Sequence, residues 1–263
     1  MYIVSNNTKL KSSTQPVIGS WINSNSTILC ELIASLGFDF LTLDAEHTAM
    51  NIKDAQLMYQ AIKSGNRYCI PLVRLPDISE SRIKRHLDAG AGGIIVPLVK
   101  SPSEVKKILK SVHYPPKGIR GVGYARSNLY GTQLSEQLNN QTTKPFVCIQ
   151  IEHVDAVENI KQLLSFEDLD AIMIGPYDLS ASLGIPGDFS NKIFLDTIKT
   201  IENEAVEHNI MLGTHIIKPD VKKATDAIDK GYNFLAYSLD ITVVSQILSQ
   251  DLKKIKNYYK NDA

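Results

Sequence analysis

Short apolar runs recur along the chain, separated by segments with helical periodicity. The runs are rich in Val, Ile and Leu, and most are continuous rather than alternating, which is typical of strands buried on both faces of a parallel sheet. Eight such runs are present, at residues 17–22, 38–43, 69–75, 93–99, 146–151, 171–174, 210–216 and 234–239. We therefore predict eight parallel strands.

Amphipathic segments follow these runs. The spacing of apolar residues predicts helices over residues 27–36, 51–63, 79–89, 101–112, 155–164, 191–208, 220–230 and 241–258. The clearest start is Ser101 followed by Pro102, an N-cap and a first-turn proline. A strand and a helix alternating eight times predict a (β/α)8 TIM barrel, an α/β fold, formed by a single domain over residues 1–263.

The longest irregular stretch is residues 114–141, which contains P-P-K-G-I-R-G-V-G-Y-A-R. A long loop inside a compact domain usually serves a function. We therefore expect this segment to contribute to a binding or catalytic site.

Polar side chains gather where the apolar runs end. In a (β/α)8 barrel the carboxyl ends of the strands meet on one face, and catalytic groups lie there. The candidates at these ends are Trp21, Asp44, Glu46, His47, Arg74, Gln150, Glu152, Asp178, Thr214, His215, Ser238 and Asp240. Such a cluster would be unusual in a purely structural barrel, so we expect an active site on this face.

Two carboxylates follow neighbouring strands of the predicted barrel. Glu152 comes after the fifth run and Asp178 after the sixth, and adjacent parallel strands lie about 4.8 Å apart. The two side chains can therefore converge on one hard cation such as Mg²⁺ or Mn²⁺. Either acid alone is better explained as a helix cap, so the pair is what favours a metal site.

An arginine and a histidine in this cluster require partners. Arg74 lies in the apolar run C-I-P-L-V-R-L-P, where an unpaired guanidinium would be costly to bury. It pairs either with a nearby acid or with an oxyanion of the substrate. His47 follows Asp44 and Glu46, an arrangement that suggests a base held by a carboxylate, although a single histidine is more often structural.

Composition narrows the class of partner. Lys plus Arg and Asp plus Glu both number 28, so a nucleic acid or an anionic membrane has little electrostatic attraction for this chain. Three distant cysteines without a C-x-x-C pair predict reduced thiols in the core. The N-terminal residues lack the apolar region of a signal peptide, and no run is long enough to span a membrane. We expect a cytoplasmic protein.

Five motifs occur in one order along the chain: L-D-A-E-H, V-R-L-P, Y-P-P-K-G-I-R-G-V, Q-I-E and G-P-Y-D-L-S. In this order and spacing, the sequence resembles the HpcH/HpaI aldolases over roughly residues 17–245. The resemblance implies a metal-dependent class II pyruvate aldolase. It also implies a homo-hexamer built from dimers that exchange a C-terminal helix, here residues 241–258.

The resemblance implies roles on the metal and pyruvate side. Glu152 and Asp178 would hold Mg²⁺, Mn²⁺ or Co²⁺, and Arg74 would bind the keto or enolate oxygen of a 2-oxo acid. No lysine suited to a Schiff base lies in the cluster, because Lys100 and Lys218 fall outside it. A class I aldolase is therefore disfavoured.

Further roles follow from the same resemblance. His47, partnered by Asp44, would act as a base or activate a water, and Gln150 would contact the substrate near the metal. Backbone N–H groups around Gly175 and Pro176 would bind the substrate carboxylate. We also expect Trp21, at the end of the first run, to line the substrate site.

The sequence departs from the family pattern on the side of the second substrate. It has G-T-H-I-I at residues 213–217 and Y-S-L-D at residues 237–240, where the family usually carries a small apolar segment and G-S-D. His215 would meet the second substrate, or it is a neutral histidine bonded to a loop. Aldol cleavage to pyruvate and an aldehyde is the first expectation.

Two alternatives remain open. One branch of the superfamily condenses acetyl-CoA with oxaloacetate to make citrate for siderophores, and oxaloacetate can use the same metal chelate. A non-catalytic barrel that binds a 2-oxo acid is the third interpretation. The presence of Glu152, Asp178, Arg74 and His47 together argues against that last possibility.

Overall fold

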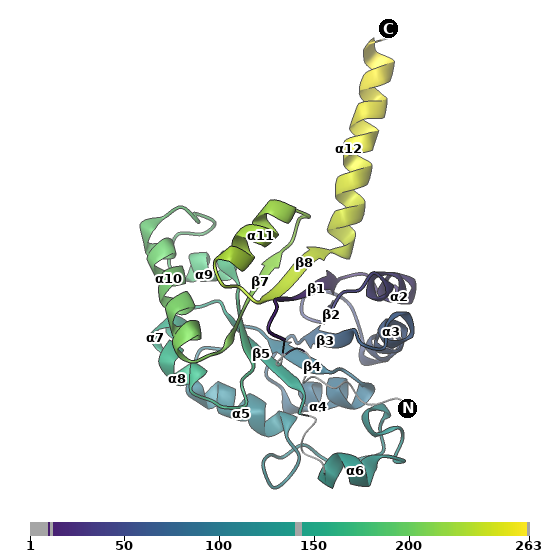
Figure 1. The fold of residues 1–263 in the computed structure, drawn as a ribbon, viewed down its shortest axis with the longest axis vertical. Helices are drawn as coiled ribbons and strands as arrows, with labels where there is room; N and C mark the ends of the chain where they lie inside the picture. Colours follow the sequence, from purple (N-terminus) through teal and green to yellow (C-terminus); the bar gives the residue numbers. More distant parts are fainter. Residues whose placement is uncertain (1–9, 11–12, 140–143, 262–263) are drawn as a thin grey trace.

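Eight parallel strands close into a barrel in sequence order, with β1 paired to both β2 and β8 (Figure 1). The computed structural model describes Leu10, residues 13–139 and residues 144–261. The strands are β1 (Val17–Ile22), β2 (Phe40–Asp44), β3 (Ile70–Arg74), β4 (Gly93–Val96), β5 (Phe146–Ile151), β6 (Ala171–Ile174), β7 (Met211–Ile216) and β8 (Phe234–Leu239). The predicted (β/α)8 barrel is confirmed.

Helices surround the barrel. They are α2 (Thr27–Ser35), α3 (Ile52–Gly65), α4 (Glu80–Ala89), α5 (Pro102–Val112), α6 (Leu134–Asn139), α7 (Val154–Glu158), α8 (Ile160–Leu164), α9 (Pro176–Ser182), α10 (Lys192–Glu207), α11 (Val221–Asp229) and α12 (Asp240–Asn261), with a 3-10 turn η1 (Arg126–Asn128). The segment predicted as one helix over 155–164 is two short helices, which meet at Asn159. Helix α9 was not predicted.

Side-chain caps explain where the clearest helices begin. The Asn51 side chain accepts hydrogen bonds from the N–H groups of Lys53 and Asp54 at the start of α3. Ser101 and Glu104 form the reciprocal capping box of α5, with Pro102 in the first turn. Because these caps satisfy donors that have no partner inside the helix, they stabilise the helix starts.

The strand residues alternate between two apolar cores. One core lies inside the barrel and includes Phe40, Phe146 and Phe234, whereas the other lies between the strands and the helices. Side chains two residues apart on a strand share a face. Asp44 and Arg74 therefore face the interior of the barrel at its carboxyl end, and they are register partners in the β2–β3 ladder.

Strand β4 ends earlier than the predicted run over 93–99. Pro97 has no N–H group to donate to the sheet, and Leu98 adopts a left-handed conformation with φ of 52°. The chain turns at this point, so that the Leu98 N–H points toward β5 and donates to Glu152.

The long connection predicted as irregular over 114–141 contains the turn η1 and helix α6. Its last two residues, 140 and 141, lie outside the described residues. The connection is fastened to α4 by Arg120, which bonds the Asp88 carboxylate at 2.7 Å, and by Arg126, which donates to the Ala89 carbonyl.

Helix α12 extends away from the barrel as a single rod (Figure 1). Its exposed apolar side chains are Ile241, Val244, Ile247, Leu248, Leu252, Ile255, Tyr258 and Tyr259. None of the helices in the described residues has the length and hydrophobicity needed to cross a bilayer. Cys30, Cys69 and Cys148 are buried thiols, as the sequence predicted.

Candidate active site

Arg74, the last residue of β3, is held by the carboxylates of Asp44, the last residue of β2, and of Glu46, two residues later. Its Nε donates to Oδ1 of Asp44 at 3.0 Å, and its Nη2 donates to Oδ2 of Asp44 at 2.7 Å. Its Nη1 lies 3.2 Å from Oε2 of Glu46. A guanidinium has five N–H donors, so this arrangement orients Arg74 and leaves two donors for a ligand.

This pairing shapes the acidity of both carboxyl groups. Burial alone would raise the pKa of Asp44, but the bonds and charge of Arg74 outweigh it and hold the pKa below its usual value. Burial raises the pKa of Glu46, although Arg74 opposes the rise. Asp44 is therefore a fixed anion whose main contact is Arg74.

The surroundings of His47 differ from those predicted. Asp44 Oδ1 accepts a hydrogen bond from the backbone N–H of His47 at 3.3 Å, whereas the carboxylate near the imidazole ring is that of Glu46. The Nε2 atom lies 3.7 Å from Oε2 of Glu46, and the side chain is 65% exposed. The Asp44 carboxylate bonds Arg74 rather than the His47 ring because the strand register places Asp44 opposite Arg74.

Glu152 is buried at the end of β5 and anchored through both oxygens. Oε1 accepts from Nε2 of Gln150 at 2.8 Å, and Oε2 accepts from the Leu98 N–H at 3.0 Å. A Cβ atom at position 175 would lie 2.3 Å from Oε1 of Glu152. Gly175 is therefore required for the chain to pass this carboxylate so closely.

The electrostatics around Glu152 favour a cation. Its pKa is raised to about 7, chiefly by burial; the Leu98 N–H opposes the rise, and the negative charges of Asp178 and Glu46 add to it. The Oε1 atom of Gln150 is buried without a hydrogen-bond partner among the described residues. Uncompensated carboxylates beside a free carbonyl oxygen fit a hard divalent ion, which prefers oxygen ligands.

Protein side chains alone do not complete a metal site in the described residues. In the described part of the chain, no group of three or more His, Cys, Asp and Glu side chains is arranged to hold a metal. An ion held by Glu152 and Asp178 would therefore take its remaining ligands from substrate and water. Such a partly open site is typical of catalytic Mg²⁺.

The turn from β6 into α9 follows Gly175 and Pro176. The Gly175 N–H is already donated to the Ile151 carbonyl at 3.2 Å, and proline has no N–H. The N–H groups left for an anion are therefore those of Tyr177 and Asp178 in the first turn of α9. An anion at this turn would therefore meet the N–H groups that follow Gly175 and Pro176, rather than those of these two residues themselves.

Trp21 lies between Arg74 and His215. The indole and imidazole rings are stacked with centroids 4.7 Å apart, and the Arg74 guanidinium carbon lies 5.3 Å from the indole centroid. Nε2 of His215 lies 3.0 Å from the Ser238 carbonyl, which can only accept, so this nitrogen carries the proton. Burial lowers the pKa of His215 to about 4, so the ring is neutral near pH 7.

A model of the HpcH/HpaI aldolase/citrate lyase family matches residues 17–246. The chain belongs to this family. The 2-keto-3-deoxy-L-rhamnonate aldolase of Escherichia coli is 30% identical over 242 residues, which cover 91% of this chain and 89% of that protein. The predicted family and the predicted class of aldolase-type lyase are confirmed.

Two solved structures share the whole fold of this chain. An HpcH/HpaI aldolase from Desulfitobacterium hafniense aligns with a TM-score of 0.87 at 28% identity, covering 96% of this chain and 97% of that one. The citrate synthase SbnG aligns with a TM-score of 0.84 at 27% identity, covering 99% of this chain and 100% of that one. The fold is thus shared with an aldolase and with a citrate synthase, the two activities considered from the sequence.

Two contributions to this HpcH/HpaI site were not predicted. Glu46 binds the guanidinium of Arg74, and the Leu98 backbone bonds Glu152. The sequence carried a signal for the first, because Glu46 lies two residues beyond Asp44 at the same strand end. The sequence carried no signal for the bond from Leu98 to Glu152, since the left-handed conformation of a leucine after a proline cannot be recognised from residue types.

Proposed function

We propose that the protein is a divalent-metal-dependent aldolase that cleaves a 4-hydroxy-2-oxo acid to pyruvate and an aldehyde, and forms it in reverse. One observation carries the proposal. The oriented guanidinium of Arg74 shares the mouth of the barrel with Glu152, whose pKa Asp178 helps to raise. The activity named for the Escherichia coli relative supports the same class of reaction.

Each residue has a role in this proposal. Glu152 and Asp178 hold the ion, with Mg²⁺, Mn²⁺ and Co²⁺ as candidates. When bound, the ion supplies Lewis acidity that stabilises an enolate by several kcal/mol. Arg74 donates its two free N–H groups to the C2 oxygen, where negative charge develops during cleavage. Gln150 positions Glu152 and presents its carbonyl oxygen to the substrate.

Bond cleavage requires a base for the 4-hydroxyl group. His47 takes this proton, directly or through a water, and Glu46 stabilises the resulting imidazolium. The C3–C4 bond then breaks, its electrons form the enolate of pyruvate, and the aldehyde leaves. Return of the proton to C3, directly or through a water, gives pyruvate and restores neutral His47. The first turn of α9, after Gly175 and Pro176, binds the substrate carboxylate, and Trp21 forms a wall of the site.

Hydrogen exchange at C3 of pyruvate tests the proposal. The protein would be incubated with pyruvate and Mg²⁺ in D₂O, and loss of the methyl signal followed by NMR. We expect exchange with Mg²⁺ and none with a chelator, because enolate formation depends on the ion. No exchange by a folded protein with saturating metal would contradict the aldolase.

A citrate-forming condensation of acetyl-CoA with oxaloacetate is the second candidate. It is favoured by the likeness to citrate synthase SbnG over the whole chain and by the imidazole of His215 beside Trp21. Release of free coenzyme A from the two substrates would support it. If both assays were silent, the remaining candidate would be a barrel that binds a 2-oxo acid without catalysis.

We also propose that the protein forms a homo-hexamer through α12. The exposed apolar side chains of this helix and its projection away from the barrel support association with another copy (Figure 1). Light scattering coupled to size exclusion should give six times the chain mass of 29.2 kDa. A monomer at micromolar concentration would contradict this assembly.

A further inference from the structure

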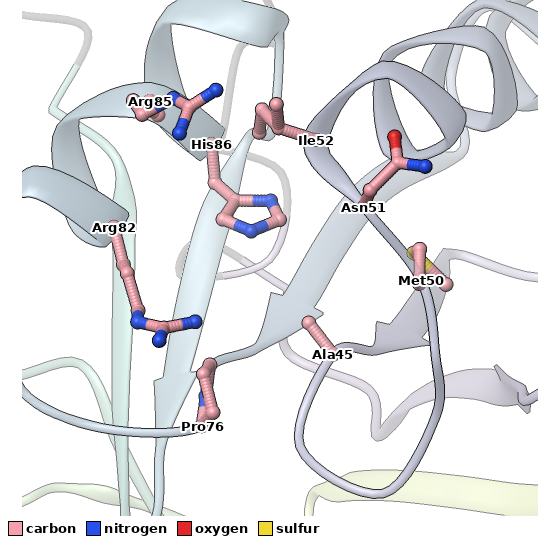
Figure 2. A pocket seen from close by; sticks show the side chains of 8 residues that line it. All are labelled: Ala45, Met50, Asn51, Ile52, Pro76, Arg82, Arg85 and His86. Atoms are coloured by element: carbon pink, nitrogen blue, oxygen red, sulfur yellow. The ribbon is translucent and has the colours of Figure 1, made fainter.

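A pocket of about 350 Å³ lies outside the barrel, between the start of α3 and the face of α4 (Figure 2). It is lined by Ala45, Met50, Asn51, Ile52, Pro76, Arg82, Arg85 and His86. Ala45 and Ile52 pack against the outer core, whereas Asp44 faces the barrel interior. The ends of β2 and β3 therefore separate this pocket from the candidate active site.

Two arginines give the pocket a positive charge. Arg85 is exposed and has no ion-pair or hydrogen-bond partner within the described residues. Arg82 shares its charge with Asp77, whose Oδ2 lies 3.1 Å from its Nε, and both side chains are about half exposed. Figure 2 shows Arg82, Arg85 and His86 reaching from α4, opposite Asn51 and Ile52. One guanidinium is thus neutralised in part and the other not at all.

His86 adds a neutral donor. Its Nδ1 lies 2.8 Å from the buried hydroxyl of Tyr59. Among the described residues, Nδ1 is the hydrogen-bond partner found for that hydroxyl. The bond satisfies the hydroxyl hydrogen only if Tyr59 donates and Nδ1 accepts, which places the ring proton on Nε2. Burial and the charges of Arg85 and Arg82 lower the pKa of His86 to about 4, so the ring is neutral near pH 7.

The remaining walls are apolar. Met50, Ile52 and Pro76 offer carbon surface, and the volume exceeds what a single oxyanion needs. Three donor groups on one helix match the three terminal oxygens of a phosphate better than the two of a carboxylate. The apolar side then suits the carbon skeleton attached to that phosphate.

We propose that this pocket is a binding site for the phosphate group of an organic phosphate, with Arg85 as its principal ligand and with Arg82 and the Nε2–H of His86 as supporting donors. The phosphate belongs either to a free phosphate ester or to a coenzyme A thioester used as second substrate. An occupant would contact the connection from β2 to α3, which carries Glu46 and His47. The site does not depend on the proposed aldolase reaction.

Calorimetric titration of the full chain tests the site, with inorganic phosphate and coenzyme A as probes in low-salt buffer without other multivalent anions. Arg85→Gln should weaken phosphate binding about tenfold, since a charge-assisted hydrogen bond is lost. Arg82→Gln should weaken it less, because Asp77 already shares that charge. Arg67→Gln removes an exposed arginine that contacts Tyr68 and should bind phosphate like the original chain.

The outcomes separate the two sources of phosphate. Coenzyme A binding that is tighter than phosphate binding, and that is weakened by Arg85→Gln, would assign the pocket to an acyl-CoA. Equal binding of both probes, still dependent on Arg85, would assign it to a free phosphate ester. Absent phosphate binding, or identical binding by the Arg85→Gln and Arg67→Gln variants, would overturn the site. Metal-dependent pyruvate exchange should stay unchanged in Arg85→Gln, so failure here is distinct from failure of the aldolase.

Discussion

Two corners of the barrel mouth handle charge in opposite ways. At the ends of β2 and β3, Arg74 is bonded by Asp44 and paired with Glu46, so opposite charges meet. At the ends of β5 and β6, Glu152 is surrounded by neutral donors and by the like charge of Asp178. At the first corner carboxylates already oppose the charge of Arg74, and two of its N–H groups are left for a ligand. At the second corner a cation would be needed to oppose the like charges of Glu152 and Asp178. The first corner is therefore suited to present an oriented donor to the substrate, and the second is suited to a cation.

Removal of the charge at Glu152 should have the largest effect. Glu152→Gln keeps the size of the side chain but loses the anionic ligand, so we expect metal-dependent pyruvate exchange to fall at least about 10³-fold. Titration with Mn²⁺ should show metal affinity reduced at least about tenfold.

Glu158→Gln serves as the matched control, because Glu158 is an exposed acid on the neighbouring helix α7. Its exchange rate and metal affinity should equal those of the original chain. Full activity in Glu152→Gln would show that Glu152 is not a metal ligand, and the two corners would then not differ in the way described.

A smaller loss of activity is expected from a change at Arg74. Arg74→Lys retains the charge but cannot reproduce the two bonds to Asp44 together with the contact to Glu46. The exchange rate should fall about 10²-fold, the scale of one lost oxyanion donor, while Mn²⁺ affinity changes little. Arg67→Lys is the control. Loss of metal binding in Arg74→Lys would mean that the two corners act as one unit.

The pH dependence of stability sharpens the contrast in the metal-free protein. Because the pKa of Glu152 is raised from 4.5 to about 7 in the folded state, the native chain retains a proton that the unfolded chain releases. The free energy of unfolding should therefore fall as pH rises from about 4.5 to about 7, by about 3 kcal/mol from this group.

Urea denaturation across this range, with a chelator present, measures the fall. Glu152→Gln should lack the contribution, so the difference between the two proteins should shrink as pH falls toward 4.5. Saturating Mg²⁺ should reverse the trend, since the ion binds the ionised carboxylate. Parallel curves for both proteins would show that Glu152 has no unusual acidity.

The smallest effect is expected at His215. His215→Leu removes the bond to Ser238 and the imidazole that stacks on Trp21, but it leaves both corners intact. Preference among second substrates should change, measured as the ratio of kcat/KM values, while Mn²⁺ affinity stays constant. An unchanged ratio would restrict His215 to a structural role.

The barrel could be predicted because most strands are buried on both faces and therefore have nearly continuous apolar sequences. Runs such as Phe146–Ile151 have the same bounds in the structure. Helix α9 was missed because seven residues are too few to show helical periodicity. The early end of β4 was missed because it depends on the left-handed conformation of Leu98.

The residue types of the candidate site could be predicted from their place at strand ends, but their partners could not. Asp44 was expected beside the His47 ring and instead bonds Arg74, because the β2–β3 register sets them opposite each other. The Arg85 pocket was also missed. It forms where α3 and α4 pack, and the sequence of one helix does not show which helix packs against it.

The chain contains one tryptophan, Trp21, and its indole is stacked between Arg74 and His215. Tryptophan emission from this protein therefore originates entirely at the mouth of the barrel. Ligand entry, metal loading and movement of the guanidinium all alter the surroundings of that single ring. The wild-type chain thus contains its own fluorescent reporter, and events in the site can be followed in real time without a label.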